Sequence, residues 1–162
     1  MSLLSFFFTK STKDIVPICD INIKRYLGIW YEIARFPHTF EKGLDNVTAT
    51  YKFREDGKIQ VINSGFKNQK KKETKGVAWI KDPQCTGKLL VSFFWIIKSE
   101  YKIIYIDPEY NYAVVTSSTM DYLWILSRKP KIEDVIYNDL VIFAASKGFA
   151  IKKLIKVLHD KQ

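Results

Sequence analysis

Histidine and cysteine are scarce in this chain of 162 residues, which limits the kinds of site it can build. With His38 and His159 as the only histidines, a histidine-rich metal site or a histidine-based catalytic dyad has little to draw on. Cys19 and Cys85 are too few for a disulfide scaffold, and nothing near them has metal-ligand spacing. One bridge between the two cysteines could form, but we expect free thiols, no metal and no cofactor.

Long apolar runs and linker-like composition are also missing. The longest nearly unbroken apolar stretch, residues 89–97, is far shorter than the roughly 20 residues of a membrane-spanning helix. Seven Gly and five Pro are too few for a chain dominated by linkers, and 47% hydrophobic with 27% charged residues is an ordinary globular balance. The length fits one domain of roughly 100–200 residues.

Acidic residues are outnumbered, because 26 Lys and Arg face 17 Asp and Glu and leave a net charge of +9. Such a charge favours anionic partners, among them nucleic acid, phospholipid headgroups and fatty acids, without choosing between them.

The amino terminus has an apolar start, residues 3–8, which is shorter than the core of a good signal peptide and has no basic residue before it. Ile18 stands where a processed lipoprotein cysteine would have a small residue. We expect residues 1–14 to be loose, residues 1–19 to form a tail or signal remnant, and residues 20–162 to form a single domain.

Beyond residue 28 the chain is a series of short strand-like runs. They are rich in aromatic and β-branched residues and are separated by turn residues, as at Asp56-Gly57 and Asp82-Pro83. Eight antiparallel strands at even spacing predict a sandwich or a barrel. The runs are residues 30–36, 47–53, 59–63, 74–81, 89–94, 101–106, 112–115 and 122–126.

One helix is predicted after the strands. Apolar residues repeat at helical spacing over 132–144, Pro130 lies just upstream, and Gly148 stands where a C-terminal cap belongs. Its apolar stripe should lie against the outside of the sheet, and residues 154–158 could add an edge strand. The predicted fold class is therefore all-β with one C-terminal helix.

If the strands close into a barrel, alternate residues face inward. The less charged alternation turns Lys102 outward to water and Glu32 and Ala34 inward; an inward Glu32 needs a hydroxyl or a cation nearby. Small inward residues such as Ala49 favour a ligand cavity over the alternative, a filled core. The predicted lining is Ala49, Tyr51, Phe53, Val61, Asn63, Ala78, Val91, Phe93, Tyr105, Tyr122 and Trp124.

Three places in the sequence resemble the signatures of the lipocalin family. They are Gly28-Ile29-Trp30 at the first strand, Asp107-Pro-Glu-Tyr110 between the sixth and seventh, and Arg128 after the eighth. The strings at 25–36 and 121–128 are similar to the bacterial outer-membrane and apolipoprotein D-like branch of that family. In the middle signature, Pro108-Glu109 replaces the usual Thr-Asp.

The resemblance implies an eight-stranded up-and-down barrel, a calyx closed at one end by a kernel of Gly28, Trp30 and Arg128. Arg128 should lie on the Trp30 ring in a cation–π contact. At the open mouth we expect a basic loop and an apolar loop tip. Lys70, Lys71 and Lys72 of the basic loop are either simply solvated or attract an anionic headgroup. Trp95, at the apolar tip, marks a membrane, partner or dimer contact.

We therefore expect a non-enzymatic carrier of a fatty acid or lysophospholipid, tail inward and head at the rim. The resemblance places it in the cell envelope, as a monomer or homodimer. A haem or bilin carrier, with His38 as axial ligand, is an alternative. A nucleic-acid-binding barrel fits less well, because its aromatic residues would face outward beside Lys and Arg. An isomerase-like enzyme needs an inward cysteine, and neither Cys19 nor Cys85 is predicted to face inward.

Overall fold

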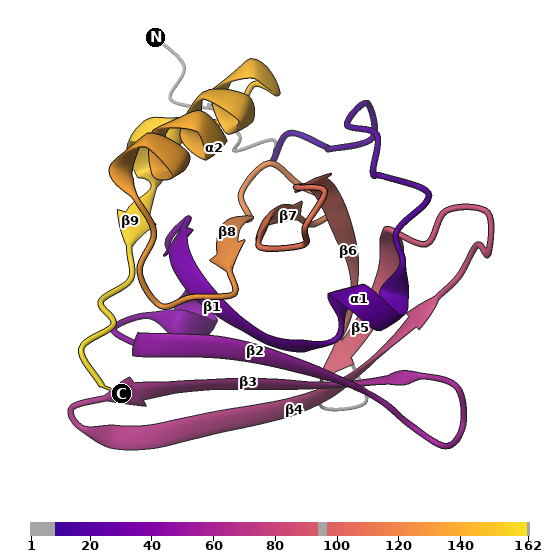
Figure 1. The fold of residues 1–162 in the computed structure, drawn as a ribbon, viewed down its shortest axis with the longest axis horizontal. Coiled ribbons are helices and arrows are strands. Elements are labelled where there is room, and N and C mark those ends of the chain that lie inside the picture. The colour runs from indigo at the N-terminus through magenta and orange to yellow at the C-terminus, as the bar shows by residue number, and fades with distance from the viewer. Residues whose placement is uncertain (1–8, 94–96, 162) are drawn as a thin grey trace, which may run out of the picture.

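Eight antiparallel strands close into a barrel, because β1 pairs with β8 on one side and with β2 on the other (Figure 1). The computed structural model describes residues 9–93 and 97–161. Strands adjacent in the chain are adjacent in the barrel, which confirms the predicted up-and-down topology. The strands are β1 (Gly28–Arg35), β2 (Asp45–Phe53), β3 (Ile59–Lys67), β4 (Lys70–Ile80), β5 (Lys88–Phe93), β6 (Ile97–Ile106), β7 (Tyr112–Thr116) and β8 (Leu123–Ser127).

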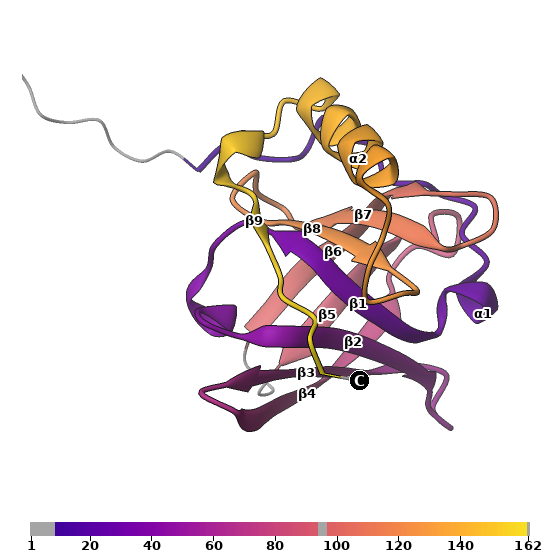
Figure 2. The ribbon, with the colours of Figure 1, turned by 60° about the vertical axis from the view of Figure 1, so that its left-hand side comes forward.

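The mouth is the end of the barrel where β1 leads into β2 and β3 leads into β4, at the left of Figure 2. A 3-10 turn, η1 (Thr39–Glu41), lies in the connection from β1 to β2. The opposite, closed end begins at Gly28 and carries the short helix α1 (Ile23–Tyr26). Ile21 and Tyr26 are buried there against the interior core.

The β3–β4 hairpin is longer than predicted. The two strands stay paired up to a tight turn at Asn68 and Gln69, whose φ angles are 50° and 63°. Two positive φ angles in succession match the turn geometry that suits twisted hairpins. Lys70, Lys71 and Lys72 are therefore exposed strand residues, not the loop residues that we expected.

The helix α2 (Asp134–Ser146) packs on the outside of the barrel, as predicted. Its buried residues Leu140 and Ala144 belong to the same apolar cluster as Val114 and Ile125 of β7 and β8. Beyond it, η2 (Ile151–Lys153) leads into β9 (Ile155–Lys156), which pairs with the outer edge of β1. In the described chain, no helix has the length and apolar character that crossing a bilayer requires.

Residues 9–21 pack along the outside of the barrel, so the expectation of a loose segment up to residue 14 was wrong for residues 9–14. Thr12 is fully buried, and its N–H donates to the carbonyl oxygen of Ser118 at 2.9 Å. Further along, the Ile18 N–H donates to the Ile103 carbonyl of β6, also at 2.9 Å. This segment, which we call the N-terminal strap, runs from the β7–β8 connection at the mouth toward the closed end. The domain boundary at residue 19 stays a prediction.

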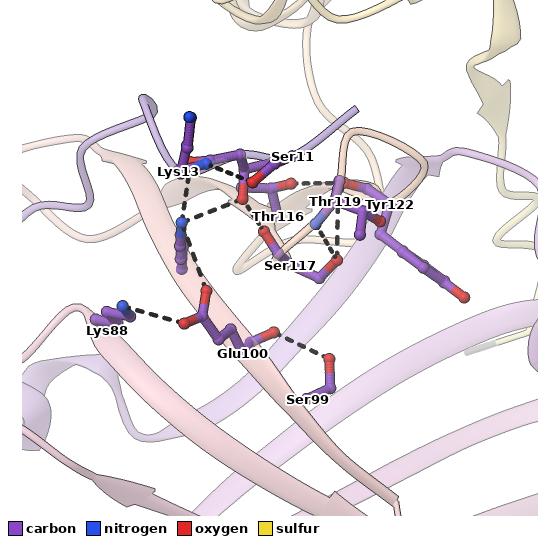
Figure 3. A network of polar contacts seen from close by, with 11 residues as sticks. Ser11, Lys13, Lys88, Ser99, Glu100, Thr116, Ser117, Thr119 and Tyr122 are labelled. Carbon is purple, nitrogen blue, oxygen red and sulfur yellow. Dashed lines mark hydrogen bonds and ion pairs between the residues drawn. The ribbon is translucent and has the colours of Figure 1, made fainter. Parts of the chain in front are cut away.

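Lys102 lies beneath the strap, where we expected it to face water. It points outward from β6 as the alternation predicts, but the strap covers that face and leaves the residue 4% exposed. Its Nζ donates to the carbonyl and hydroxyl oxygens of Thr12 at 3.0 and 3.1 Å, and it lies 3.5 Å from the Glu100 carboxylate. Figure 3 shows how these contacts join the strap, β6 and the β7–β8 connection into one network.

A disulfide joins Cys19 to Cys85, so the expectation of free thiols was wrong. The strap brings Cys19 beside the turn between β4 and β5, where the Thr86 N–H donates to the Cys19 carbonyl at 3.0 Å. The approach depends on Gly87, since a Cβ there would collide with the carbonyl oxygen of Ile18. The two cysteines are 66 residues apart in sequence, which hid this proximity.

Candidate ligand-binding site in the barrel

Arg128 seals the closed end of the barrel. Its guanidinium carbon lies 3.9 Å from the centroid of the fully buried Trp30 ring, which confirms the predicted cation–π contact. Its Nη1 donates to the Ile29 carbonyl at 2.9 Å, and its Nη2 donates to the carbonyls of Arg25 and Tyr26 at 2.7 and 3.1 Å. One side chain thus ties α1, β1 and β8 together.

The turn between β6 and β7 completes this end. The Asp107 carboxylate accepts hydrogen bonds from the N–H groups of Glu109 and Tyr112. The Tyr110 hydroxyl accepts from the Asn22 N–H at 2.9 Å, just before α1. The turn with Pro108 is thus held by hydrogen bonds to Asp107 and to Tyr110.

Three tyrosine hydroxyls form the floor of the interior. The Tyr101 hydroxyl lies 2.6 Å from that of Tyr26 and 2.9 Å from that of Tyr51. Burial raises the pKa of all three groups, and for Tyr51 the charges of Glu32 and Glu41 raise it further. The floor is therefore uncharged at neutral pH and polar only at its hydroxyl oxygens.

On four strands, burial of the inward side chains falls from the closed end toward the mouth, whereas on β1 and β7 the inward side chains are buried along the strand. On each of β2, β3, β5 and β8, the inward residue nearer the mouth is half-buried and the next inward residue is buried. An interior sealed at one end and reached by solvent at the other has this gradient. The half-buried residues are Ala49, Asn63, Phe93 and Trp124, and their buried counterparts are Tyr51, Val61, Val91 and Leu126. Ala78 of β4 is buried in the same core.

Small inward residues do not all leave empty space. A Cβ on Gly76 would lie 2.7 Å from two carbons of the Phe93 ring, so the ring occupies the position that a side chain at residue 76 would need. Gly76 and Phe93 are register partners across β4 and β5. Gly76 therefore makes room for an aromatic ring and does not mark an empty space.

Phe53 was wrongly predicted to line the interior. It is 50% exposed, because β1 begins at Gly28 opposite Tyr51 and Phe53 lies two residues past that point. It therefore projects beyond the closed end, where no β1 residue faces it.

Tyr105 was also wrongly placed inside. The pairing of β6 with β7 shifts between Ile103 and Tyr105, and this irregularity turns both Ile104 and Tyr105 outward. The Tyr105 ring packs against Phe143 of α2 with centroids 5.2 Å apart.

A second irregularity turns Arg35 into the barrel. The pairing of β1 with β8 shifts between Glu32 and Ala34, so Ala34 joins the outer cluster and Arg35 lies opposite the inward Trp124. The predicted inward position of Ala34 was wrong for this reason. Arg35 Nη1 donates to Glu32 Oε1 at 2.8 Å and supplies the cation that an inward Glu32 requires.

Glu41 of η1 reaches into the same cluster just inside the mouth. Its Oε2 lies 2.7 Å from His38 Nε2, accepts from Trp124 Nε1 at 3.3 Å and lies 3.8 Å from Arg35 Nε. The rings of His38 and Trp124 are 5.6 Å apart, and Tyr122 stacks on Trp124 at 5.8 Å. Just inside the mouth, the wall therefore consists of aromatic rings around the carboxylate of Glu41.

The two buried carboxyls respond in opposite directions to this environment. Burial raises the pKa of Glu32 well above its usual range, and the charge of Glu41 adds to that rise against the opposing effect of Arg35. Burial also acts to raise the pKa of Glu41, but the hydrogen bond and charge of His38, together with Arg35 and Trp124, lower it overall. Glu41 is therefore the more acidic of the two carboxyls, and Glu32 keeps its hydrogen bond from Arg35.

The comparisons with known proteins agree with this geometry. The family model of the Lipocalin-like domain matches residues 21–159. The chain belongs to the lipocalin family. It is 45% identical over 147 residues to the outer membrane lipoprotein Blc of Citrobacter freundii, covering 90% of this chain and 83% of that one.

Two further relatives place this lipocalin in the predicted branch and fold. Bovine (Bos taurus) apolipoprotein D is 33% identical over 144 residues, covering 83% of this chain and 75% of that one. The solved structure of insecticyanin from the tobacco hornworm Manduca sexta superposes with a TM-score of 0.77 at 23% identity, covering 95% of this chain and 89% of that one.

Two surface pockets of this lipocalin, of about 360 and 320 Å³, lie outside its barrel, between the strap and the end of α2, and share Lys10 and Met120 as lining residues. Neither is lined by an inward strand residue. The inward lining of the strands marks the interior as the candidate site.

Two residues of the site escaped the sequence analysis. Arg35 was missed because the strand irregularity that turns it inward has no signature in the alternation of Glu32-Ile33-Ala34-Arg35. Glu41 was missed because it lies between strands, although its spacing from His38 is a usable signal. Trp95 lies outside the described residues, and within the described ones no cluster of three or more His, Cys, Asp or Glu is placed to hold a metal ion.

Proposed function

We propose that this lipocalin binds and carries a small lipophilic ligand inside its barrel and performs no catalysis on it. The observation that supports this most is the gradient of burial along β2, β3, β5 and β8, from a sealed floor to a solvent-reached mouth. The lining is apolar and aromatic, so its contacts with a ligand are non-directional and tolerate different chains.

A long-chain fatty acid or a lysophospholipid fits this interior, with its tail toward the floor and its headgroup at the mouth. Burying one methylene contributes about 0.8 kcal/mol, so a dozen contribute on the order of 10 kcal/mol before the cost of association is subtracted. Ala49, Val61, Phe93 and Trp124 are the side chains that we expect the tail to contact.

We place the protein in the cell envelope. Relatives that match 90% of this chain are named outer membrane lipoproteins, and the Cys19–Cys85 disulfide fits an oxidising compartment such as the periplasm. Contact with a membrane surface through the mouth belongs to the same proposal. Phe40 there is 66% exposed, and Lys70, Lys71 and Lys72 suit anionic headgroups. We expect a monomer or a homodimer.

Replacing Trp124 with lysine tests the location of the ligand. A charge inside the apolar wall should weaken binding of a fluorescent polyene fatty acid by about tenfold or more, equivalent to about 1.4 kcal/mol. The measurement is a fluorescence titration, with circular dichroism to verify that the variant is folded.

Tyr105→Lys is the matched control, because Tyr105 is an aromatic strand residue on the outer face. It should bind the fatty acid as the wild type does. Equal affinity in Trp124→Lys and the wild type would contradict the proposed location, and absence of saturable binding by the wild type would contradict the function.

A further inference from the structure

Three donor groups converge on one carboxylate inside the mouth. His38 Nε2, Trp124 Nε1 and Arg35 Nε lie 2.7, 3.3 and 3.8 Å from Glu41 Oε2. Arg35 and Trp124 belong to β1 and β8, whereas His38 is the N-cap residue of η1 and lies with Glu41 in the connection from β1 to β2. The barrel wall and this connection together form a carboxylate site, which the Glu41 side chain fills.

The site faces the interior that a ligand would enter. Arg35 is the register partner of the inward Trp124, and the Glu41 charge acts on the floor tyrosine Tyr51, raising its pKa. A lipid with its tail on the floor and its head toward the mouth would therefore bring its headgroup past these donors.

The donors are not fully used by Glu41. Arg35 Nε and both ring nitrogens of His38 are buried and have no hydrogen-bond partner among the described residues, although His38 Nε2 lies 2.7 Å from Glu41 Oε2. The Arg35 and His38 side chains are only 3% and 10% exposed. Buried polar groups in this state favour a ligand that accepts their hydrogen bonds.

Little apart from this carboxylate holds η1 in place. The turn contains no buried residue, and Phe40 in its centre is 66% exposed. Its other bonds to the wall come from Arg35 Nη2, which donates to the carbonyls of Glu41 and Leu44 at 2.7 and 3.3 Å. Departure of the Glu41 side chain therefore costs few apolar contacts.

We propose that the carboxylate of a bound fatty acid exchanges with that of Glu41, binding to Arg35, His38 and Trp124 while Glu41 turns out to solvent. The inference rests on the proposed function, since the lipid must first enter the barrel. Exchange of one carboxylate for another leaves the number of charges in the site unchanged. A long-chain alcohol of the same length is a poorer replacement for Glu41, because His38 and Trp124 would lose the anion that faces them and Arg35 would keep only Glu32. The site selects long-chain carboxylic acids over uncharged lipids.

Glu41→Gln is the variant that tests the exchange. The amide keeps the size of the side chain and removes the competing charge, so affinity for hexadecanoic acid should rise by about fivefold or more, about 1 kcal/mol. Affinity for hexadecanol, measured in the same calorimetric or competition titration, should change by less than about twofold. Glu55→Gln, which removes an exposed carboxylate from the turn between β2 and β3 at the closed end, is the matched control and should change neither affinity.

A second measurement monitors Trp124 in the barrel wall and requires no variant. The indole N–H signal of Trp124 in the wild-type protein should shift when hexadecanoic acid binds, because its acceptor changes, and shift less with hexadecanol. Binding of both lipids without a gain for the acid in Glu41→Gln overturns the exchange and leaves the proposed function standing. If the wild type binds neither lipid, both fail.

Discussion

Arg128 stabilises the closed end of the barrel through several contacts of a single side chain. Its cation–π contact with Trp30 is worth about 0.5–2 kcal/mol, and its guanidinium also donates to four backbone carbonyls that α1, β1 and the β6–β7 turn would otherwise leave exposed at the rim. The pairing of Trp30 with Arg128 could be predicted from sequence, because both ends of an up-and-down barrel meet at one rim. The backbone bonds could not, since they depend on the path of α1.

Glu100 shows a charge effect that depends on the strap. Its carboxylate lies 3.1 Å from Lys88 Nζ and 3.5 Å from the buried Lys102 Nζ (Figure 3). Burial acts to raise the pKa of Glu100, but the hydrogen bond from Lys88 and the charges of both lysines outweigh it and lower the pKa. A depressed folded-state pKa adds stability above the unfolded pKa, and that stability is lost as pH falls through the folded value.

Glu100→Gln should therefore be less stable than the wild type at pH 7 by about 0.5–1 kcal/mol, a modest value because the pair is partly screened by solvent. The difference should shrink as pH falls from the unfolded-state pKa, about 4.3, through the lower pKa of the folded state, where the wild-type carboxylate becomes protonated. Urea unfolding at a series of pH values measures it, with the exposed Glu55→Gln as control. A difference independent of pH would show that the ion pairs are not its origin.

Strand positions could be predicted from the sequence, but side-chain direction could be predicted only as far as the first irregularity in each strand. Val61 and Val91 face inward as the alternation requires, on strands whose pairing is regular. Tyr105 and Arg35 do not, because β6 and β1 each contain an extra residue within a run whose apolar pattern gives no sign of it. The inward and outward residues of the candidate site can be assigned correctly only when these irregularities in β6 and β1 are known.

The N-terminal strap is the element whose position could be predicted least from the sequence. Many of its hydrogen bonds join backbone groups to β6, to the β7–β8 connection and to the β4–β5 turn, and backbone bonds of this kind leave no pattern in the sequence. Cys19 and Cys85 fix its far end to the β4–β5 turn.

Replacing both cysteines with serine should lower the free energy of unfolding by about 2–4 kcal/mol, because the unfolded chain loses a cross-link across a long loop. Chemical denaturation of the oxidised wild type and the double variant measures the loss, and reductant should lower the stability of the wild type only. Equal stability of the two proteins, with two titratable thiols in the native wild type, would contradict the bridge.

At the scale of the whole molecule, the barrel separates two apolar regions with different roles. One lies between α2 and the outer faces of β6, β7, β8 and β1 and is a packed core. The other lies inside the barrel, where side chains are buried at the floor and several are half-buried nearer the mouth. Glu41, with its contact to His38, and the exposed Phe40 lie at this mouth. A carrier needs this asymmetry, since a tail requires a dry wall and a headgroup requires an opening.

The most direct test of lipid binding in the barrel is paramagnetic NMR with stearic acid carrying a nitroxide at its tail end, compared with the same acid labelled near its carboxyl. The tail label should broaden the amide signals of floor residues Tyr51, Val61 and Val91, and the carboxyl-end label those of Tyr122 and Trp124. Broadening confined to the outer face of α2 and the β3–β4 hairpin, with the floor signals unchanged, would contradict a lipid inside the barrel.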